Sequence, residues 1–582
     1  MNEWIGTTQG ICIDGVNSAV RPDMIGQSQI AWGLNATVRE GKPRTRTGIV
    51  QRLLLPDGRV QGAGYFSQGN GEMVFMIGGK PYRITMNGNT FSDMLLPLPF
   101  YNSEILPTSW MQETSGFFVI QDGQSAPIIY DGGNIRRSNI FNHEVPIGRQ
   151  MAYGNGRLAV ATDGHNLVVG DITDGVGSEL LFTETGYLSN GGAFFYAQEI
   201  SALAFIPSND TATGYGSLMV FGKRFTDSLR LEITQRDLWS TIPGFQIIVL
   251  DNIGSASQMG VTRVNQDLWW RDARGSIRSL RAAASDQESP GNSSQSREVS
   301  RIVNYETEAW LSQTSGLYFN NRIIFTASPF LMENGVIGFK NLISLDAAPL
   351  ATMRSKAPPA YDGAWSGVNF VRMVKGTFND QERAFAISSD DDGHNRLWEF
   401  TTNQRQDSYQ ISDGTTAVNV PRRIKSEIEF RRFGMDKPSQ LKRITRADIY
   451  PTDIEGDVEV SLYWRVGNST QWILCDTVDF CALMSDGTTS SPHSWKNLSS
   501  QQRSKIRSFT FPSTVDPITK LHTTVGYDFQ IRLVWEGNML LDRLDVWASE
   551  LSEKRFSNIS DLDSECVQYE IIDNQVTYSI LP

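Results

Sequence analysis

Histidine is the residue type that would most readily give this chain an acid, a base or a zinc ligand. The five histidines are His143, His165, His394, His493 and His522. None of them occurs in an HxH, HExxH or HxxE pattern, so no zinc-ligand set can be read from the spacing. Two of them follow Asp-Gly in the similar segments 163–166 and 392–395, where we interpret them as residues of tight turns.

Two common local signatures of enzymes are also missing. The sequence contains no GxSxG nucleophile elbow and no GxxxxGK[ST] phosphate loop. We therefore predict no catalytic residue, no cofactor site and no enzymatic activity for this chain.

The run Asp390–Asp391–Asp392–Gly393 is the strongest candidate for a cation site. A calcium loop of the EF-hand type places acidic groups at alternate positions and ends on a glutamate. Here the chain passes directly into Arg396–Leu397–Trp398, and Glu399 falls on the next predicted strand. We interpret the run as an acidic hairpin turn and predict no metal site. A weak ion site within the loop is the alternative.

Paired carboxylates could cleave glycosides, a reaction that needs two carboxyl groups about 5–10 Å apart. Such a pair is formed by the fold and cannot be read from sequence spacing. The segment most similar to a sialidase-type Asp-box runs from Trp464 to Trp472, but it lacks the Asp and has a different spacing. We interpret that segment as an ordinary hairpin.

Basic residues form two clusters in a chain that is acidic as a whole. The chain has 64 acidic and 52 basic side chains and a formal charge of −12, which argues against a general nucleic-acid-binding protein. The candidate docking residues are Arg44, Arg46, Arg422, Arg423, Arg431, Arg432, Lys442 and Arg443. They are interpreted as a solvated sheet face, as a docking surface for an adaptor or neighbouring subunit, or as a contact with passing DNA.

The elements that would position these residues are predicted to be β-strands almost throughout. Short apolar runs alternate with Gly, Asn and Asp turns, as in Met73–Ile77, Gly78–Gly79 and Tyr82–Met86. Such hairpins recur every 40–60 residues, which favours a β-propeller over an array of sandwiches. A polar loop and a short helix are predicted at 284–312, with Ser296 as the N-cap of the helix.

Strands become longer from about residue 421. Ile424, Ser426, Ile428 and Phe430 alternate with charged residues, and 458–464 and 529–535 alternate in the same way. The segment Glu536–Gly537–Asn538 is expected to turn into a further strand at Leu540–Trp547. We therefore predict an all-β chain with a propeller followed by a β-sandwich-like C-terminal domain. The predicted units are an N-terminal segment at 1–50, a propeller at 51–420 and a platform at 421–582. The first packs on the C-terminal domain or closes the propeller.

The segment from Asp14 to Gly48 carries a resemblance to a known family. It contains Gly15-Val-Asn-Ser18, Ile25-Gly-X-X-Gln29, the pair Leu34-Asn35 and a closing Gly41-Lys-Pro-Arg-Thr-Arg-Thr-Gly48. This order resembles the start of the β-propeller tail proteins of short-tailed phages, known as tail-nozzle, tubular-tail or DNA-stabilisation proteins. The detailed match covers about 35 residues, and the rest of the chain agrees in style.

The resemblance implies a structural virion protein of the tail. Members typically form a ring of six below the portal and its adaptor, and their lumen retains and then passes double-stranded DNA without sequence-specific contacts. An acidic lumen would let the polyanion slide, so we expect acidic side chains to line it. The resemblance leaves contact with tail fibres or spikes open.

Other properties of the sequence agree with synthesis as a soluble protein in the host cytoplasm. The start MNEWIGTTQG lacks the pattern of a signal peptide, and no run of 18 apolar residues occurs. The four cysteines are widely spread and are interpreted as free thiols. The rival functions are a propeller that cleaves host glycans and one that only binds them, which would need exposed tryptophan shelves.

Overall fold

The computed structural model describes most of the chain. Outside the described residues are 1–3, 88–89, 184–191, 209–213, 232–238, 240, 286–293, 348–359, 413–416, 468, 481–506, 513–522, 552–566, 573–574 and 581–582. His493 falls in these gaps, as do His522 and most of the predicted polar loop. Within the described part, no helix is long and apolar enough to cross a membrane.

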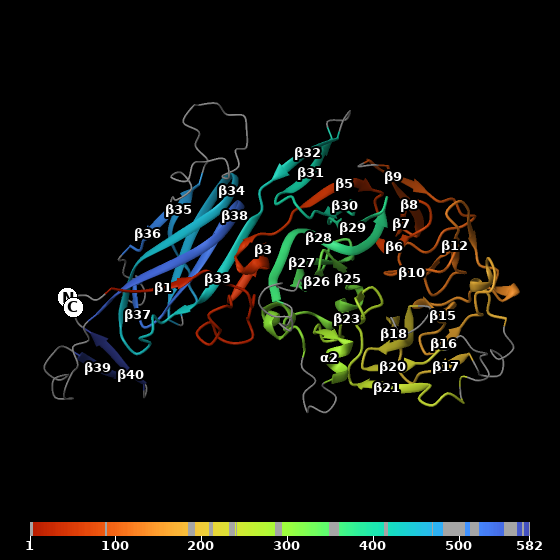
Figure 1. Cartoon of the computed structure of the whole chain (residues 1–582), viewed down its shortest axis with the longest axis horizontal. Coiled ribbons are helices and arrows are strands. Elements are labelled where there is room, and N and C mark those ends of the chain that lie inside the picture. The colour runs from red at the N-terminus through yellow and green to blue at the C-terminus, as the bar shows by residue number, and fades with distance from the viewer. Residues whose placement is uncertain are drawn as a thin grey trace.

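Five separate antiparallel sheets form blades 1 to 5 of a propeller (Figure 1). Their strands, blade by blade, are β6 (Val60–Phe66), β7 (Glu72–Ile77), β8 (Lys80–Asn87) and β9 (Thr90–Leu95); β10 (Trp110–Glu113), β11 (Phe118–Gln121), β12 (Ile128–Tyr130) and β13 (Ile135–Arg137); β14 (Met151–Gly154), β15 (Arg157–Ala161), β16 (Asn166–Val169) and β17 (Ala193–Phe195); β18 (Ile200–Pro207), β19 (Tyr215–Gly222), β20 (Phe225–Leu229) and β21 (Gln246–Asp251); β22 (Val261–Val264), β23 (Asp267–Arg271) and β24 (Ile277–Ser279).

Two further four-stranded groups of the large, 19-stranded sheet continue the ring. Their strands are β25 (Gly316–Phe319), β26 (Arg322–Leu331), β27 (Ile337–Asp346) and the first part of β28 (Ala360–Phe378), then the second part of β28, β29 (Gln381–Ser389), β30 (Asn395–Phe400) and β5 (Ile49–Leu55). The inner strands β6, β10, β14, β18, β22, β25 and β28 contact one another in that order, and β28 returns to β6. Because β5 precedes blade 1 and pairs with β30, the chain closes its own ring.

Turn chemistry explains why the blades form where the sequence predicts them. Ile77 pairs with Lys80 across Gly78 and Gly79, whose φ angles of 54° and 76° are those that a two-residue hairpin turn requires. In the turn at 163–166, the Asp163 carboxylate accepts hydrogen bonds from the backbone N–H groups of His165 and Asn166 at 3.0 and 2.7 Å. Local hydrogen bonding therefore sets the strand boundaries.

The C-terminal domain is one sheet curled on itself around an apolar core. Its strands are β33 (Lys425–Phe433), β34 (Lys442–Val466), β35 (Ile473–Asp479), β36 (Arg507–Thr510), β37 (Val525–Gly526), β38 (Phe529–Glu550) and the N-terminal β1 (Trp4–Gln9). β34 and β38 pair along their lengths, with register shifts where they bend. Both layers of the curl bury large side chains, among them Trp464 and Trp535. The predicted class, a propeller followed by a β-sandwich-like domain, is confirmed.

A short N-terminal strand joins the two domains. β2 (Trp32–Leu34) pairs antiparallel with β33 through Trp32 and Glu429, and parallel with β28 through Leu34 and Ala364. β3 (Ala36–Thr37) and β4 (Arg44–Thr45) pair with each other, and β4 also contacts β38. β1 pairs with β38 over six residues. The N-terminal segment is therefore built into both domains.

One local prediction was wrong and another holds only in part. The Glu536–Gly537–Asn538 segment was expected to turn one strand into the next, but β38 runs through it, because Gly537 bends the strand at a φ of 121° without reversing it. The helix predicted from Ser296 is broken into η5 (Arg297–Val299), α3 (Ser300–Val303) and η6 (Glu308–Gln313). Ser296 makes no side-chain capping bond to it; its hydroxyl instead accepts a hydrogen bond from the Ile277 N–H.

The remaining short elements include four strands and one helix. β31 (Asp407–Ser412) and β32 (Ala417–Arg422) form a hairpin after the last blade. α2 (Leu280–Ser285) follows blade 5. β39 (Val567–Ile572) and β40 (Gln575–Ile580) form a separate hairpin near the C-terminus. Figure 1 shows this last hairpin at one end of the molecule and β21 toward the other.

Candidate functional site

A cavity of about 330 Å³ lies at one end of the propeller, where the chain enters successive inner strands. Its wall includes the segments 106–108, 149–150, 199–201, 256–258 and 312–313, which lead into β10, β14, β18, β22 and β25. The turns at 122–124 and 223 complete the wall. We call it the axial cavity. In a propeller such an end is where loops of many blades meet, so it is the natural place to look for a ligand.

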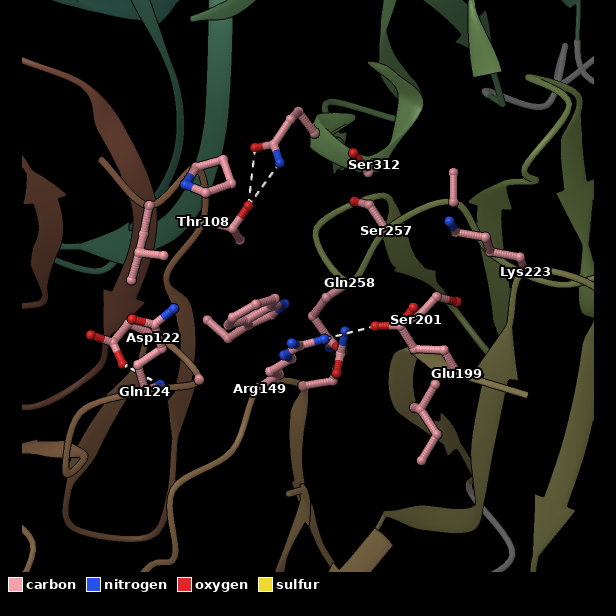
Figure 2. Close-up of a pocket in the computed structure, with 18 residues that line it drawn as sticks. Thr108, Asp122, Gln124, Arg149, Glu199, Ser201, Lys223, Ser257, Gln258 and Ser312 are labelled. Atoms are coloured by element: carbon pink, nitrogen blue, oxygen red, sulfur yellow. Dashed lines mark hydrogen bonds and ion pairs between the residues drawn. The ribbon is translucent and has the colours of Figure 1, made fainter. Parts of the chain in front are cut away.

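The charged groups of the axial cavity are distributed around it. Asp122 and Gln124 lie on one side and Glu199, Ser201 and Lys223 on the other, with Arg149 and Gln258 between them (Figure 2). Arg149 donates to Glu199 at 2.7 Å. Asp122 Oδ1 accepts hydrogen bonds from the backbone N–H groups of Gln124 and Ser125 at 2.8 and 2.7 Å. Glu199 and the Oδ1 atom of Asp122 thus already have structural partners, whereas Asp122 Oδ2 is buried without a hydrogen bond.

The wall of the axial cavity is cross-linked by glutamine side chains. Gln258 Nε2 donates to the carbonyl oxygens of Leu203 (2.8 Å) and Met151 (3.3 Å), and Gln258 Oε1 accepts from the Leu203 N–H at 2.8 Å. These bonds tie the entry of blade 5 to blades 3 and 4.

A second set of bonds ties η6 to the segment before blade 2 and to β28. Gln313 Nε2 donates to Thr108 Oγ1 at 2.8 Å, and the fully buried Arg372 donates to the Gln313 carbonyl at 2.7 Å. Burial lowers the pKa of Arg372 to about 10. The residues that line the cavity include no His, Cys or Tyr.

The described turn histidines are occupied by local contacts. His165 Nδ1 lies 3.0 Å from the Tyr196 carbonyl, and the ring stacks on Phe195. His394 Nδ1 lies 2.8 Å from an Asp57 carboxylate oxygen, and this hydrogen bond raises the pKa of His394. His143 is the left-handed cap of η2 (Ile140–Asn142). Their turn positions explain these residues without catalysis.

The acidic run at 390–393 is likewise used by its own turn. Asp390 accepts hydrogen bonds from the His394 N–H at 2.8 Å and from Arg396 at 3.0 Å, and Asp391 accepts from the Glu333 N–H at 3.3 Å. Across the described residues, no group of three His, Cys, Asp or Glu side chains is placed to hold a metal ion.

The eight predicted docking residues do not form one surface. Arg46 and Lys442 are buried, which corrects their prediction as surface residues. Lys442 donates to backbone carbonyls, including Gln440 at 2.7 Å and Tyr527 at 2.9 Å. Arg432 is also mostly buried, 3.9 Å from both Asp23 and Asp528. These three side chains are buried because their charged groups lie against oxygen acceptors inside the protein.

The other five differ in exposure. Arg422 is exposed and lies over the Tyr409 ring, and Arg423 is 3.5 Å from Glu536. Arg44 is 3.9 Å from Asp453 and mostly covered. Arg431 lies over Phe433 and donates to Gln9, and Arg443 pairs through its backbone within the C-terminal sheet. Of the eight, only Arg422, the last residue of β32, and Arg423, which follows it, are therefore exposed.

The resemblance segment instead supplies the joint between the domains. Asn35 donates to the Lys425 carbonyl and to Ser366 Oγ, both at 3.0 Å. Thr45 Oγ1 donates to the Gly537 carbonyl and accepts from Trp535 Nε1, both at 2.8 Å. Arg46 donates to the Asp407 carboxylate through two hydrogen bonds of 2.9 Å. We call these three residues and their partners the domain joint.

Sequence reasoning missed both the axial cavity and most of the domain joint. Arg149, Glu199 and Gln258 come one to three residues before an inner strand begins, a position that has meaning only once the blades are in register. Asp407 lies 361 residues from Arg46, so spacing gives no signal. The Thr-Arg-Thr-Gly end of the resemblance segment was the one readable pointer to Arg46.

No protein-family model matches this chain, and no curated protein matches it. Among solved structures, a chain of the "Crystal Structure of Mitotic Checkpoint Complex" is similar at 10% identity and a TM-score of 0.35, covering 61% of this chain and 94% of that one. A chain of the BBS1N–ARL6DN complex is similar at 9% identity and a TM-score of 0.36, covering 62% and 99%. At these scores neither likeness carries an argument about function.

Proposed function

We propose that this protein is a structural subunit of a short-tailed phage tail, a nozzle or hub that forms a ring-shaped channel for the genome. The observation that carries the proposal is that the resemblance segment holds the two domains together. Its residues Asn35, Thr45 and Arg46 are committed to buried hydrogen bonds of the domain joint. Buried hydrogen bonds between the two domains keep them in a fixed orientation, which a structural subunit of a tail requires.

The continuity of the large sheet supports the same role. Since β2 lies between β28 and β33, main-chain hydrogen bonds run from the propeller into the C-terminal domain. A subunit joined through a sheet resists bending at the joint, which suits a conduit under pressure from packaged DNA. The partners in this proposal are further copies in a ring, six by the resemblance, and the adaptor above it.

Glycan cleavage is the weaker proposal because the carboxylates of the axial cavity are already engaged. Asp122 is held by its own turn and Glu199 by Arg149. Glycan binding is also weaker: of the described tryptophans, only Trp4 is more than a third exposed. Arg465 and Arg532 already lie over the ring of Trp472, which leaves it a poor platform for a sugar.

Immunogold labelling of intact virions with an antibody to this chain tests the proposal. Label at the single tail vertex is the expected result. Label absent from particles, with the protein found free, would overturn it, and release of reducing sugar from host glycan would then favour an enzyme. Within a confirmed ring, reversing several lumen carboxylates should slow genome ejection without blocking assembly, since an acidic wall repels DNA.

A further inference from the structure

The C-terminal hairpin pairs with none of the other described strands. Among the described strands, β39 and β40 pair only with each other, from Val567 opposite Ile580 to Ile572 opposite Gln575. The apolar residues at alternate, directly opposed positions are Val567, Tyr569, Ile571, Val576, Tyr578 and Ile580. An isolated two-stranded hairpin is marginally stable in water at best. This pattern indicates that the hairpin needs a surface to cover it.

Strand β21, the outermost strand of blade 4, has a free edge of the kind that accepts a further strand. It pairs with β20, and no other described strand pairs with it. Ile247 and Ile248 are 52% and 69% exposed. Native sheets usually protect such edges with charge. The outer strands β9 and β13 carry Asp93 and two arginines, whereas β21 has no charged residue before Asp251.

The neighbouring blade extends the apolar surface beside β21. Phe194 of β17 contacts Phe245, the residue before β21, with ring centroids 5.6 Å apart. Phe195, one residue later, is 72% exposed, but it stacks on His165 and lies on the opposite face of β17 from Phe194. Ile247 and Ile248 of β21, together with the contacting pair Phe194 and Phe245, form what we call the rim patch.

Charge favours a meeting of the hairpin with this part of the propeller. The C-terminal segment 551–582 has six acidic and two basic residues, a net charge of −4. Blades 4 and 5 show the opposite balance: between 200 and 285, one described acidic residue is exposed, Asp251. The exposed basic residues described there are Lys223, Arg224, Arg230, Arg263, Arg274 and Arg281. The acidic tail therefore has exposed cations on blades 4 and 5 to which it can be attracted.

We infer that the C-terminal hairpin of one copy adds to the edge of β21 on a second copy and covers the rim patch. The strands match in length, since β21, β39 and β40 have six residues each. The hairpin and β21 lie toward opposite ends of the same chain (Figure 1), so the contact joins two chains. A head-to-tail contact of this kind repeats into a ring or a filament. The inference rests on the proposed function, because a ring of subunits needs such a contact.

Site-specific photo-cross-linking on the full-length chain tests this contact. A benzophenone amino acid replaces Ile248, and the control carries it at Ile105, which is 75% exposed before β10. We expect irradiation to give a covalent dimer from position 248 but not from 105, with mass spectrometry locating the bond within residues 567–580. The dimer yield should fall several-fold in high salt, because screening weakens the charge attraction.

An adduct within one chain, an adduct to any other peptide, or no adduct at concentrations where the chain is oligomeric would each overturn the inference. The Ile248→Glu variant, compared with Ile105→Glu, gives an independent reading: only the first should shift the sedimenting species toward monomer. If the cross-link does not form but the antibody labels the tail of virions, the proposed function holds and the hairpin contact is refuted. If the cross-link forms but virions carry no label, the contact holds and the proposed role in a phage tail is refuted.

Discussion

Arg46 and Asp407 form a bidentate ion pair inside the protein, with two hydrogen bonds of 2.9 Å and side chains only 2% and 7% exposed. Arg46 lies near the end of the N-terminal resemblance segment, and Asp407 begins the hairpin that follows the last blade. The Asp407 carboxylate also accepts from the Ile49 N–H at 2.9 Å, at the first residue of the closing strand β5. One ion pair therefore connects ring closure to the domain joint.

Replacing Arg46 by leucine should be strongly destabilising, because it leaves a buried carboxylate without its cation. The expected loss is about 3–5 kcal/mol of unfolding free energy. The measurement is urea unfolding followed by tryptophan fluorescence. Arg21→Leu is the matched control, since Arg21 is 62% exposed and 3.3 Å from Asp23, and should change stability by less than about 1 kcal/mol. Equal midpoints for the two variants would contradict the structural role of Arg46.

Glycine at position 48 is expected to be required for the approach of two chain segments. A Cβ atom at Gly48 would overlap the Gln406 carbonyl, and the Gly48 N–H bonds the Gln404 carbonyl at 2.7 Å. Gly48→Ala should therefore lower stability by about 1–3 kcal/mol or more. Gly26→Ala in the same segment is the control, because the nearest atom to its Cβ would lie 3.6 Å away. The measurement is the thermal unfolding midpoint of both variants. A Gly48→Ala midpoint equal to that of the unchanged protein would refute the close approach of the two segments.

Thr45 is expected to matter through its hydroxyl group. In Thr45→Val the shape is kept, but Trp535 Nε1 loses its acceptor and the Gly537 carbonyl loses a donor. Leaving such groups unsatisfied in the interior costs about 1–3 kcal/mol. Thr8→Val, at an exposed position of β1, should leave the unfolding midpoint unchanged. Differential scanning calorimetry distinguishes the two, and a silent Thr45→Val would contradict the role of the hydroxyl.

Cys12 should be unreactive while the chain is folded. Burial raises the pKa of its thiol to about 12, against a hydrogen bond from Gln9 that lowers it. At pH 8 only about one thiol in 10⁴ would then be ionised, and thiolate is the reactive form. Iodoacetamide labelling with peptide mass spectrometry should show Cys12 protected in buffer and labelled in guanidinium.

The same shift predicts a pH dependence of stability. The pKa of Cys12 in the folded chain lies above the unfolded value of about 9, so at high pH the unfolded thiol ionises before the folded one. The contribution of Cys12 to the free energy of unfolding is therefore complete below pH 9 and is lost as the pH rises toward 12. Cys12→Ala should reduce that alkaline loss. Equal labelling of folded and unfolded chains would contradict the burial.

Much of the fold could be predicted from local sequence. The hairpin at Gly78–Gly79 and the turn at Asp163–Asn166 are decided by residues that accept left-handed backbone or bond their own main chain, so their strands were readable. The alternation from Ile424 to Phe430 reported a half-buried strand for the same local reason. The C-terminal hairpin was not singled out in advance, since its short alternation resembles that of many strands.

The sequence by itself determined the all-β class, the change of strand length near residue 421 and the absence of familiar enzyme motifs, because turns and side-chain alternation are short-range properties. Only the tertiary structure decided which charges face water. Arg46 and Arg422 look alike in the sequence, yet one is buried against Asp407 and the other is exposed beside Tyr409. The difference arises because contacts between residues hundreds of positions apart depend on the path of the whole chain, which no local spacing encodes.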